Sequence, residues 1–208
     1  MSVFDRYYKE YDAWYDRNKF VYLSELEAIR EVLPREAKGL EVGVGTGRFA
    51  HALGIAMGID CSKNMLDIAA QRGVTVRWGL GEDLPFFEDT FDYVAIIITL
   101  CFVQNPQKVL SEAGRVLKKT GKIILGIIDK DSFLGEFYQR KESVFYKQAN
   151  FFSIKDISEL LKAVGFNKIT YRQTIFNYPN RLNSIEKPRK GFGKGGFVVA
   201  SAQKFSDR

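Results

Sequence analysis

The chain has 208 residues, of which 46% are hydrophobic and 27% are charged. This length and composition fit one globular domain with a substantial core, and no apolar run is long enough to predict a membrane span. The formal net charge is +6. Such a charge is compatible with an anionic substrate or a nucleic acid, but a basic solvated surface accounts for it equally well.

Cysteine and histidine are scarce. Cys61, Cys101 and His51 show no spacing typical of a metal site or a disulfide framework, so we expect no bound metal. The first ten residues are aromatic and charged and lack the apolar stretch of a signal peptide. The sequence therefore predicts a cytoplasmic protein.

Residues 4–33 are expected to be helical, and Pro34 to end this region. Aromatic side chains recur there at steps of three and four residues and should line one helical face: Phe4, Tyr7, Tyr8, Tyr11, Trp14 and Tyr15. This face either packs on the core or covers a ligand as a lid. Aromatic rings would suit a ligand that carries a cation.

The stretch from Leu40 to Ala50 predicts a strand, a tight turn and the start of a helix. Gly43, Gly45 and Gly47 occupy alternate positions, and glycine lets backbone N–H groups approach a ligand closely. Glu41 adds an acceptor, so a ligand with both a carboxylate and an ammonium group fits this turn. A purely structural turn and a dinucleotide-binding turn are the alternatives, since residues 45–50 also match G-x-G-x-x-A.

Further strands are predicted at residues 54–60, 74–78 and 91–98. Asp60 ends the second strand, where an acid can accept hydrogen bonds from ribose hydroxyls. Ser62 is expected to cap the next helix, and Met65 could contact an adenine face. Asn105 and Pro106 should begin a helix that runs to residue 118 or 119.

Glu41-x-Gly43-x-Gly45-x-Gly47 resembles motif I of the class I S-adenosylmethionine-dependent methyltransferases. The segment 105–127, NPQKVLSEAGRVLKKTGKIILGI, is similar to that family's helix and fifth strand and is more specific than the glycine pattern. The resemblance covers roughly residues 37–175. Its nearest branch is the small-molecule group that resembles ubiquinone/menaquinone-biosynthesis methyltransferases.

The resemblance implies S-adenosyl-L-methionine as the cofactor and identifies the residues expected to bind it. A Tyr-Asp-x-Trp-Tyr stretch before motif I, here residues 11–15, often closes over the ligand in the family. The expected cofactor-binding residues are Tyr15, Glu41, Val42, Gly43, Gly45, Thr46, Gly47, Asp60, Cys61, Met65, Leu80, Gly81, Glu82, Asp83, Ile98, Thr99 and Phe102.

Two departures from the family pattern bear on the site. Leu80 stands where the family usually has an aspartate that accepts from the adenine amino group, and Glu82 or Asp83 could replace that acceptor. Relatives often carry histidines near positions 101 and 102, where this chain has Cys101 and Phe102. An obvious general base is therefore missing, and no catalytic residue is assigned.

Two segments outside the family motifs could contribute to substrate binding. Residues 129–152 form an aromatic insertion that is longer than a compact connection, which favours a role in covering the substrate. Residues 168–175 and 196–202 predict the last two strands as an antiparallel hairpin, and the basic, glycine-rich 181–194 loop lies between them. That loop is expected to be solvated, or to bind phosphates of a substrate or RNA.

We therefore predict a single methyltransferase domain over residues 1–208, with residues 1–33 and 129–152 as candidate lids. The expected fold is α/β, Rossmann-like, with a seven-stranded, mostly parallel sheet in the order 3-2-1-4-5-7-6 and helices on both faces. The expected function is methyl transfer from S-adenosylmethionine to a small-molecule acceptor.

An amine is favoured as the acceptor, because a neutral amine needs no strong base. The alternatives are an RNA or protein methyltransferase anchored by the 181–194 loop, an NAD-dependent oxidoreductase, and a cofactor-binding protein without catalysis. RNA-specific signatures such as Asn-Pro-Pro-Tyr after the fourth strand are absent, which disfavours nucleic acid. The oligomeric state is left open.

Overall fold

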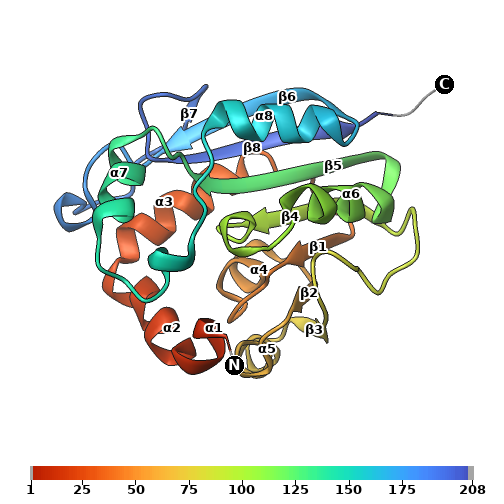
Figure 1. Cartoon of the computed structure of the whole chain (residues 1–208), viewed down its shortest axis with the longest axis horizontal. Coiled ribbons are helices and arrows are strands. Elements are labelled where there is room, and N and C mark those ends of the chain that lie inside the picture. Colours follow the sequence, from red (N-terminus) through yellow and green to blue (C-terminus); the bar gives the residue numbers. More distant parts are fainter. Residues whose placement is uncertain (1, 206–208) are drawn as a thin grey trace.

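One eight-stranded sheet forms the centre of the computed structural model, which describes residues 2–205 (Figure 1). The strand order is β3-β2-β1-β4-β5-β8-β6-β7. Neighbouring strands from β3 to β5 run parallel, and β8, β6 and β7 each run antiparallel to the preceding neighbour. The strands are β1 Gly39–Val42, β2 Met57–Asp60, β3 Thr75–Trp78, β4 Phe91–Ile97, β5 Leu117–Ile128, β6 Phe166–Thr174, β7 Arg189–Lys190 and β8 Phe197–Lys204.

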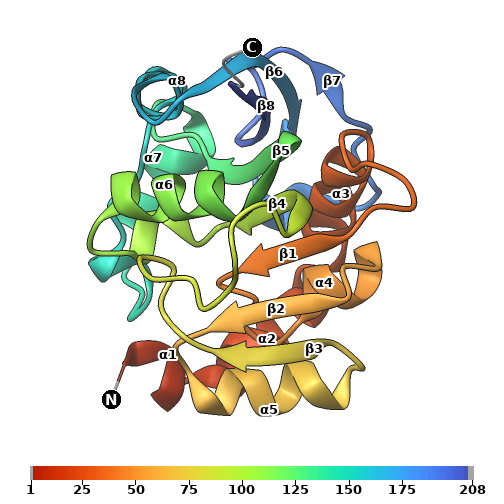
Figure 2. The same ribbon diagram turned by 90° about the vertical axis from the view of Figure 1, so that its right-hand side faces the viewer.

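Helices cover both faces of this sheet. They are α1 Val3–Arg6, α2 Tyr8–Arg17, α3 Lys19–Arg30, α4 Arg48–Leu53, α5 Lys63–Gln71, α6 Pro106–Val116, α7 Phe133–Arg140 and α8 Ile154–Ala163. Short 3₁₀ turns lie at Leu100–Phe102 (η1), Tyr146–Gln148 (η2) and Pro179–Arg181 (η3). Figure 2 shows the parallel strands from β3 to β5 as one ladder. No helix within residues 2–205 is both long and apolar enough to cross a membrane.

The core has two halves because side chains alternate between the faces of each strand. On β4, Tyr93 and Ala95 belong to the half that packs against helices α3, α4 and α5. Val94 and Ile96 belong to the other half, which packs against α6 and α8. The continuous apolar run of β4 is thus explained by burial on both faces, as in other central parallel strands.

The predicted fold class and strand order are confirmed, with β8 in the place of the seventh strand. The expected count of seven strands is wrong by one. β7 is an additional edge strand within the 181–194 loop, and its two residues pair with Arg172 and Gln173 of β6. A strand of two exposed residues carries no alternating hydrophobic pattern, so the sequence did not reveal it.

The N-terminal region is helical as expected, but it is divided into three helices, α1, α2 and α3, with breaks at Tyr7 and Asn18. Asn18 separates α2 from α3 and has φ −116° and ψ 44°, outside the helical range. Its side-chain amide donates to the carbonyl of Trp14 over 2.9 Å. Asparagine readily forms such local hydrogen bonds at the expense of helix continuity.

The other boundaries lie close to the predicted ones. Ser62 and Asn105 cap α5 and α6 through their side chains, and Ser153 forms a capping box with Asp156 at the start of α8. Helix α6 ends at Val116, two or three residues before the predicted end. Leu117 is extended and fully buried, and it pairs with Phe91, so the chain joins β5 directly.

Candidate functional site

A cavity of about 650 Å³ opens at the carboxyl ends of β1, β2 and β4. We call it the first cavity. Its walls include Val42 and Gly43 after β1, Asp60 at the end of β2, and Ile98 and Thr99 after β4. Its volume lies within the range typical of small-molecule sites, and this edge of an open α/β sheet is where ligands bind.

The glycine turn shapes the floor of the first cavity, and its three glycines all have positive φ. A Cβ on Gly43 would lie 2.1 Å from Cγ2 of Thr99, and one on Gly47 would lie 2.9 Å from Cβ of Ala69. Close packing therefore requires glycine at both positions. At Gly45 the nearest atom to such a Cβ would be 3.7 Å away, on the ring of Tyr11, so here the backbone faces the cavity.

Each carboxylate oxygen of Asp60 is held by a backbone hydrogen bond. The backbone N–H of Gly45 donates to Oδ2 and that of Ser62 donates to Oδ1, both over 2.9 Å. Burial raises the pKa of Asp60, while these backbone hydrogen bonds oppose the rise. The carboxylate still lines the first cavity, so it can accept hydrogen bonds from a ligand's hydroxyl groups.

Glu41 is buried directly before the wall residues Val42 and Gly43. Its side chain is 1% exposed, and Oε2 has no hydrogen-bond partner among residues 2–205. Burial raises the pKa of this carboxyl well above its usual range. A buried acceptor without a partner is costly, and an ammonium group on a ligand would satisfy it.

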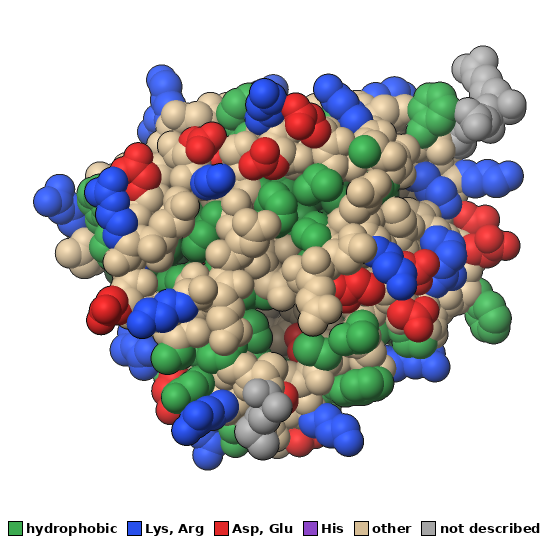
Figure 3. Space-filling model, in the orientation of Figure 1, with side chains coloured by type: hydrophobic (Ala, Val, Ile, Leu, Met, Phe, Trp, Pro, Cys, Tyr) green, Lys and Arg blue, Asp and Glu red, His purple; other side chains and the backbone are tan. Residues whose placement is uncertain are grey.

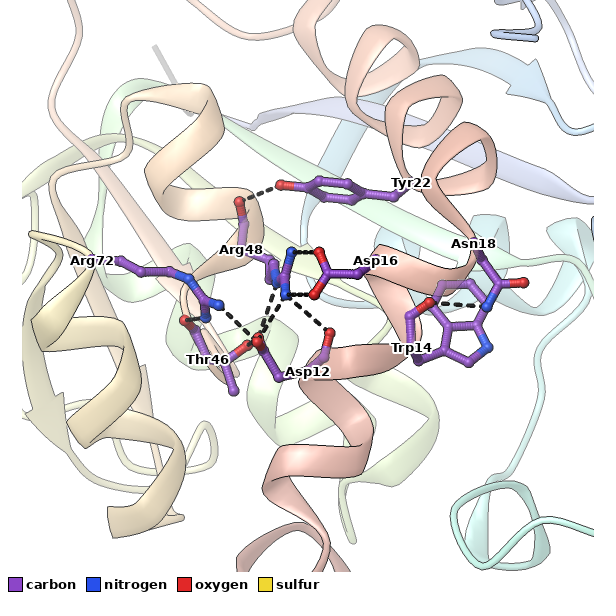
Figure 4. Close-up of polar contacts among 8 residues, drawn as sticks. All are labelled: Asp12, Trp14, Asp16, Asn18, Tyr22, Thr46, Arg48 and Arg72. Atoms are coloured by element: carbon purple, nitrogen blue, oxygen red, sulfur yellow. Dashed lines mark hydrogen bonds and ion pairs between the residues drawn. The ribbon is translucent and has the colours of Figure 1, made fainter. Parts of the chain in front are cut away.

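Helix α2 is tied to the glycine turn by an ionic network around Asp12 (Figure 4). Arg48 donates to both oxygens of Asp12, and Arg72 and Thr46 each donate to one of them. Burial alone would raise the pKa of Asp12, but these hydrogen bonds hold it well below its usual range. No sequence pattern pointed to this network, because its members are far apart along the chain.

Helix α1 is anchored beside the same cavity. The hydroxyl of Ser62 donates to Oδ1 of Asp5 over 2.6 Å, and the side-chain amide of Asn64 donates to the carbonyl of Asp5 over 2.9 Å. Helix α1 thereby contacts the start of α5, while α2 contacts the glycine turn, and Phe4 and Tyr11 join the cavity wall.

The side of the first cavity that departs from the family pattern is formed by residues 79–82. Leu80 lies there with a half-exposed side chain, and Gly81 lies against Val42 and Val109. Glu82 lines the cavity and accepts a hydrogen bond from the backbone N–H of Asn105 over 3.3 Å. Of the two acids proposed to replace the missing aspartate, only Glu82 reaches the wall, and Asp83 does not.

Most of the predicted cofactor-binding residues meet at the first cavity. Those that line it are Val42, Gly43, Gly45, Asp60, Cys61, Met65, Leu80, Gly81, Glu82, Ile98, Thr99 and Phe102. The structure places the others outside its wall: Tyr15, Glu41, Thr46, Gly47 and Asp83. Tyr15 is buried, and its hydroxyl lies 2.8 Å from that of Tyr11, which takes the expected aromatic position at the cavity.

A second cavity of about 170 Å³ adjoins the first, and Tyr11, Ile98 and Phe102 line both. Its remaining wall comes from α2, α3, the end of β5 and the 129–152 insertion, with many aromatic side chains: Trp14, Tyr15, Tyr138, Phe145 and Tyr146. Phe145 packs on Phe4 and Tyr11, with ring centroids 5.5 and 5.7 Å apart. The two candidate lids therefore meet each other over the partition between the cavities.

Glu25 of α3 is the acidic side chain buried at the second cavity. It was not among the residues predicted from the sequence, although a signal was present. Glu25 lies four residues after Val21 and four before Ile29, and both are core residues, so a charged side chain occupies the apolar face of a helix.

Comparisons with known proteins agree with this geometry. A family profile described as a methyltransferase domain matches residues 40–125. A crystal structure from Thermotoga maritima, described as a SAM-dependent methyltransferase and possible histamine N-methyltransferase, superposes with a TM-score of 0.95. It is 44% identical in sequence and covers 98% of this chain and 99% of its own.

The chain belongs to the class I S-adenosylmethionine-dependent methyltransferases. An uncharacterized protein of Methanocaldococcus jannaschii is 50% identical over 98% of this chain and 100% of its own length. A demethylmenaquinone methyltransferase of Bacillus licheniformis is 34% identical over 59% of this chain and 60% of its own. The predicted resemblance is thus confirmed, and S-adenosyl-L-methionine is the cofactor of this methyltransferase.

The residues of the first cavity fit S-adenosylmethionine. Asp60 lines the cavity and suits the ribose hydroxyls, whereas Glu41, the acceptor expected for the ammonium group, lies outside the wall with its Oε2 unpartnered among the described residues. The open backbone at Gly45 leaves room for the cofactor to approach. The glycines, Asp60 and the carboxyl ends of the strands thus form one site from segments that are separate in the sequence.

Proposed function

We propose that this methyltransferase acts on a small organic acceptor that binds in the second cavity. The observation that carries the proposal is the shared wall, in which Tyr11, Ile98 and Phe102 border both cavities. An acceptor in the second cavity would reach a cofactor in the first across this partition. The second cavity has a volume of about 170 Å³ and is lined in part by α2, α3 and α7, which suits a small molecule better than a polymer.

The bound cofactor supplies a methyl group on a sulfonium, which needs no further activation. The protein's task is then to orient the acceptor and exclude water. We propose that residues 2–33 and 129–152 do this as lids. Aromatic contacts join them, since Phe4 packs on both Phe102 and Phe145 with ring centroids 4.9 and 5.5 Å apart. The Asp12 network would hold the first lid on the glycine turn.

An amine is the favoured class of acceptor. A neutral amine attacks a methyl group without a strong base, whereas a phenol or enol requires a proton acceptor. The Thermotoga maritima protein is described as a possible histamine N-methyltransferase, which is consistent with this class. The demethylmenaquinone relative supports an aromatic carbon acceptor instead, but it covers only 59% of this chain.

The RNA alternative gains little support from the surface. On the face shown in Figure 3, Lys and Arg side chains are dispersed and mixed with Asp and Glu rather than gathered in one patch. The cations of the 181–194 loop line neither cavity. The alternative of a cofactor-binding protein without catalysis was suggested by Leu80 alone. The second cavity does not support this alternative, because a protein that only binds the cofactor needs no acceptor site.

A labelling experiment tests the proposed function. The enzyme is incubated with methyl-labelled S-adenosylmethionine and, in separate reactions, with single-ring amines, phenols, quinols and RNA. We expect label in a small molecule, with amines the best acceptors. Label in RNA alone would overturn the proposal.

A variant that fills the second cavity sharpens this test. Ser143→Trp places a large side chain at the wall of the second cavity, away from the residues that line the first. We expect turnover to fall about tenfold or more, while affinity for S-adenosylhomocysteine stays within about threefold. Unchanged turnover would place the acceptor elsewhere.

A further inference from the structure

Glu25 is a buried acidic residue whose side chain forms no hydrogen bond or ion pair with the described residues of the fold. Its side chain is 2% exposed, and Oε2 has no hydrogen-bond partner among the residues that the structure describes. Burial raises the pKa of Glu25 to about 8. Native proteins rarely bury a polar atom without a partner, so such an atom on a cavity wall indicates a ligand group that completes it.

None of the described cationic side chains at the second cavity acts as a counter-ion of Glu25. Glu10, Arg17 and Lys141 also line the cavity, but burial is the cause of the raised pKa of Glu25 and no described cation offsets it. The ammonium of Lys141 lies over the rings of Phe137 and Tyr138, 5.8 Å from each centroid.

The remaining titratable neighbours are tyrosines. Burial raises the pKa values of Tyr11, Tyr15, Tyr138 and Tyr146 above the ordinary value, so all four stay neutral. Their rings form apolar walls with negative faces, which attract a cation. The second cavity thus combines one buried carboxylate, that of Glu25, with aromatic walls.

We propose that Glu25 binds the ammonium group of a protonated organic amine, whose apolar part packs against the surrounding tyrosine rings. This inference rests on the proposed function and names Glu25 as the residue that selects the acceptor. Before methyl transfer, the ammonium gives one proton to the Glu25 carboxylate, which frees the nitrogen lone pair to attack the methyl group. A neutral alcohol would leave the carboxylate unpaired, and an anionic acceptor would be repelled by it. A cavity of about 170 Å³ is of the size that holds a single aromatic ring or a short aliphatic chain.

The proposal includes a proton balance. At pH 7 the empty site holds Glu25 mainly in its protonated form, since its pKa is about 8. A protonated amine that pairs with the carboxylate displaces this proton to solvent. Binding of each amine molecule should therefore release close to one proton near pH 7, whereas a neutral alcohol should release none.

Calorimetry on the full chain tests this proposal. The protein is first saturated with S-adenosylhomocysteine, which cannot donate a methyl group. It is then titrated with benzylamine, 2-phenylethylamine and histamine, and with benzyl alcohol and 2-phenylethanol as neutral counterparts. Each titration is run in two buffers with different ionisation enthalpies, so that proton release is measured directly. We expect at least one amine to bind about tenfold more tightly than its alcohol.

Two variants separate the role of Glu25 from a general effect of charge. Glu25→Gln keeps the shape of the side chain and should weaken amine binding about tenfold or more, abolish proton release and leave alcohol binding unchanged. Glu27→Gln is the matched control, because Glu27 lies on the same helix as Glu25 but lines neither cavity, and its side chain is 45% exposed. Its effect on amine affinity should stay within about twofold.

The outcomes test the role of Glu25 and the proposed small-molecule function separately. If the parent binds S-adenosylhomocysteine but no amine binds more tightly than its alcohol, or if Glu25→Gln binds amines as well as the parent, the role of Glu25 is overturned. Methyl transfer to phenols or quinols alone would overturn it too, while the small-molecule function would stand. Methyl transfer to RNA alone would overturn the proposed function.

Discussion

Arg48 donates hydrogen bonds to both carboxylate oxygens of Asp12, over 2.9 Å from Nε and 2.8 Å from Nη2. Arg48 is the first residue of α4, directly after the glycine turn, whereas Asp12 belongs to α2. This pair therefore joins the N-terminal helices to the segment that forms the floor of the first cavity. Arg72 strengthens it with a 2.7 Å ion pair to the same carboxylate.

Asp12→Asn should lower the free energy of unfolding by about 3 kcal/mol, because two largely buried guanidinium groups would lose their shared partner. Urea denaturation measures this change. Asp16→Asn is the matched control: Asp16 also pairs with Arg48, but its side chain is 67% exposed. Removing an exposed partner should cost less than about 1 kcal/mol. Equal losses in the two variants would show that the central position of Asp12 has no special importance.

Asp60→Ala should weaken binding of S-adenosylhomocysteine by about 2 kcal/mol or more, since charge-assisted hydrogen bonds to ribose hydroxyls would be lost. Calorimetric titration gives the affinity. Asp60 also accepts from the N–H groups of Gly45 and Ser62, so thermal unfolding without ligand must accompany the titration. Asp67→Ala, at an exposed position on α5, is the control. An affinity change below about threefold in a folded Asp60→Ala protein would leave Asp60 a structural role only.

Glu25→Gln should stabilise the ligand-free protein at neutral and alkaline pH. Burial raises the folded-state pKa of Glu25 to about 8, above the unfolded value of about 4.3, so ionisation favours the unfolded chain. The resulting loss of stability begins as pH rises above about 4.3 and is complete above about pH 8, reaching about 4 kcal/mol near pH 7. The difference in unfolding free energy between variant and parent should therefore grow with pH over that window. If the difference in unfolding free energy did not change with pH, the raised pKa of Glu25 in the folded protein would be contradicted.

Neutralising Lys187, Arg189, Lys190 and Lys194 together should leave turnover of a small acceptor within about threefold, because exposed cations act mainly through a field that salt screens over about 10 Å. None of the four lines either cavity. Initial rates at low and high salt provide the measurement. A nucleic-acid substrate would respond differently, with a large loss of affinity and a flatter salt dependence in the variant.

The segments predicted best from the sequence are those whose signals are local. The glycine turn, Asp60 and the caps at Ser62 and Asn105 each depend on neighbours within a few residues, and parallel strands then bring their carboxyl ends together. Most residues of the 181–194 loop are exposed, as expected. The end of this loop is also held by Gln173, whose side-chain oxygen accepts from the N–H groups of Lys194 and Gly195 over 2.8 Å, a contact with no local signal.

The acceptor side of the site could not be predicted in the same way. Tyr11, Glu25 and Phe145 come from three segments whose spacing in the sequence says nothing about their distance in space. The periodicity that places Tyr11 and Tyr15 on one helical face is sound, and the two hydroxyls are in contact. It could not tell which ring borders the first cavity, because that depends on how α2 packs on Gly45.

The anchoring of α1 has a practical consequence for the assays above. Ser2 and Val3 border the first cavity, and Asp5 is bonded to Ser62 beside Asp60. An affinity tag fused before Ser2 would begin at the mouth of the cofactor site and could slow cofactor binding. Lys204 ends β8, donates hydrogen bonds to Leu117 and Asp89, and lines neither cavity. A purification handle attached after β8 should therefore leave cofactor kinetics unaltered.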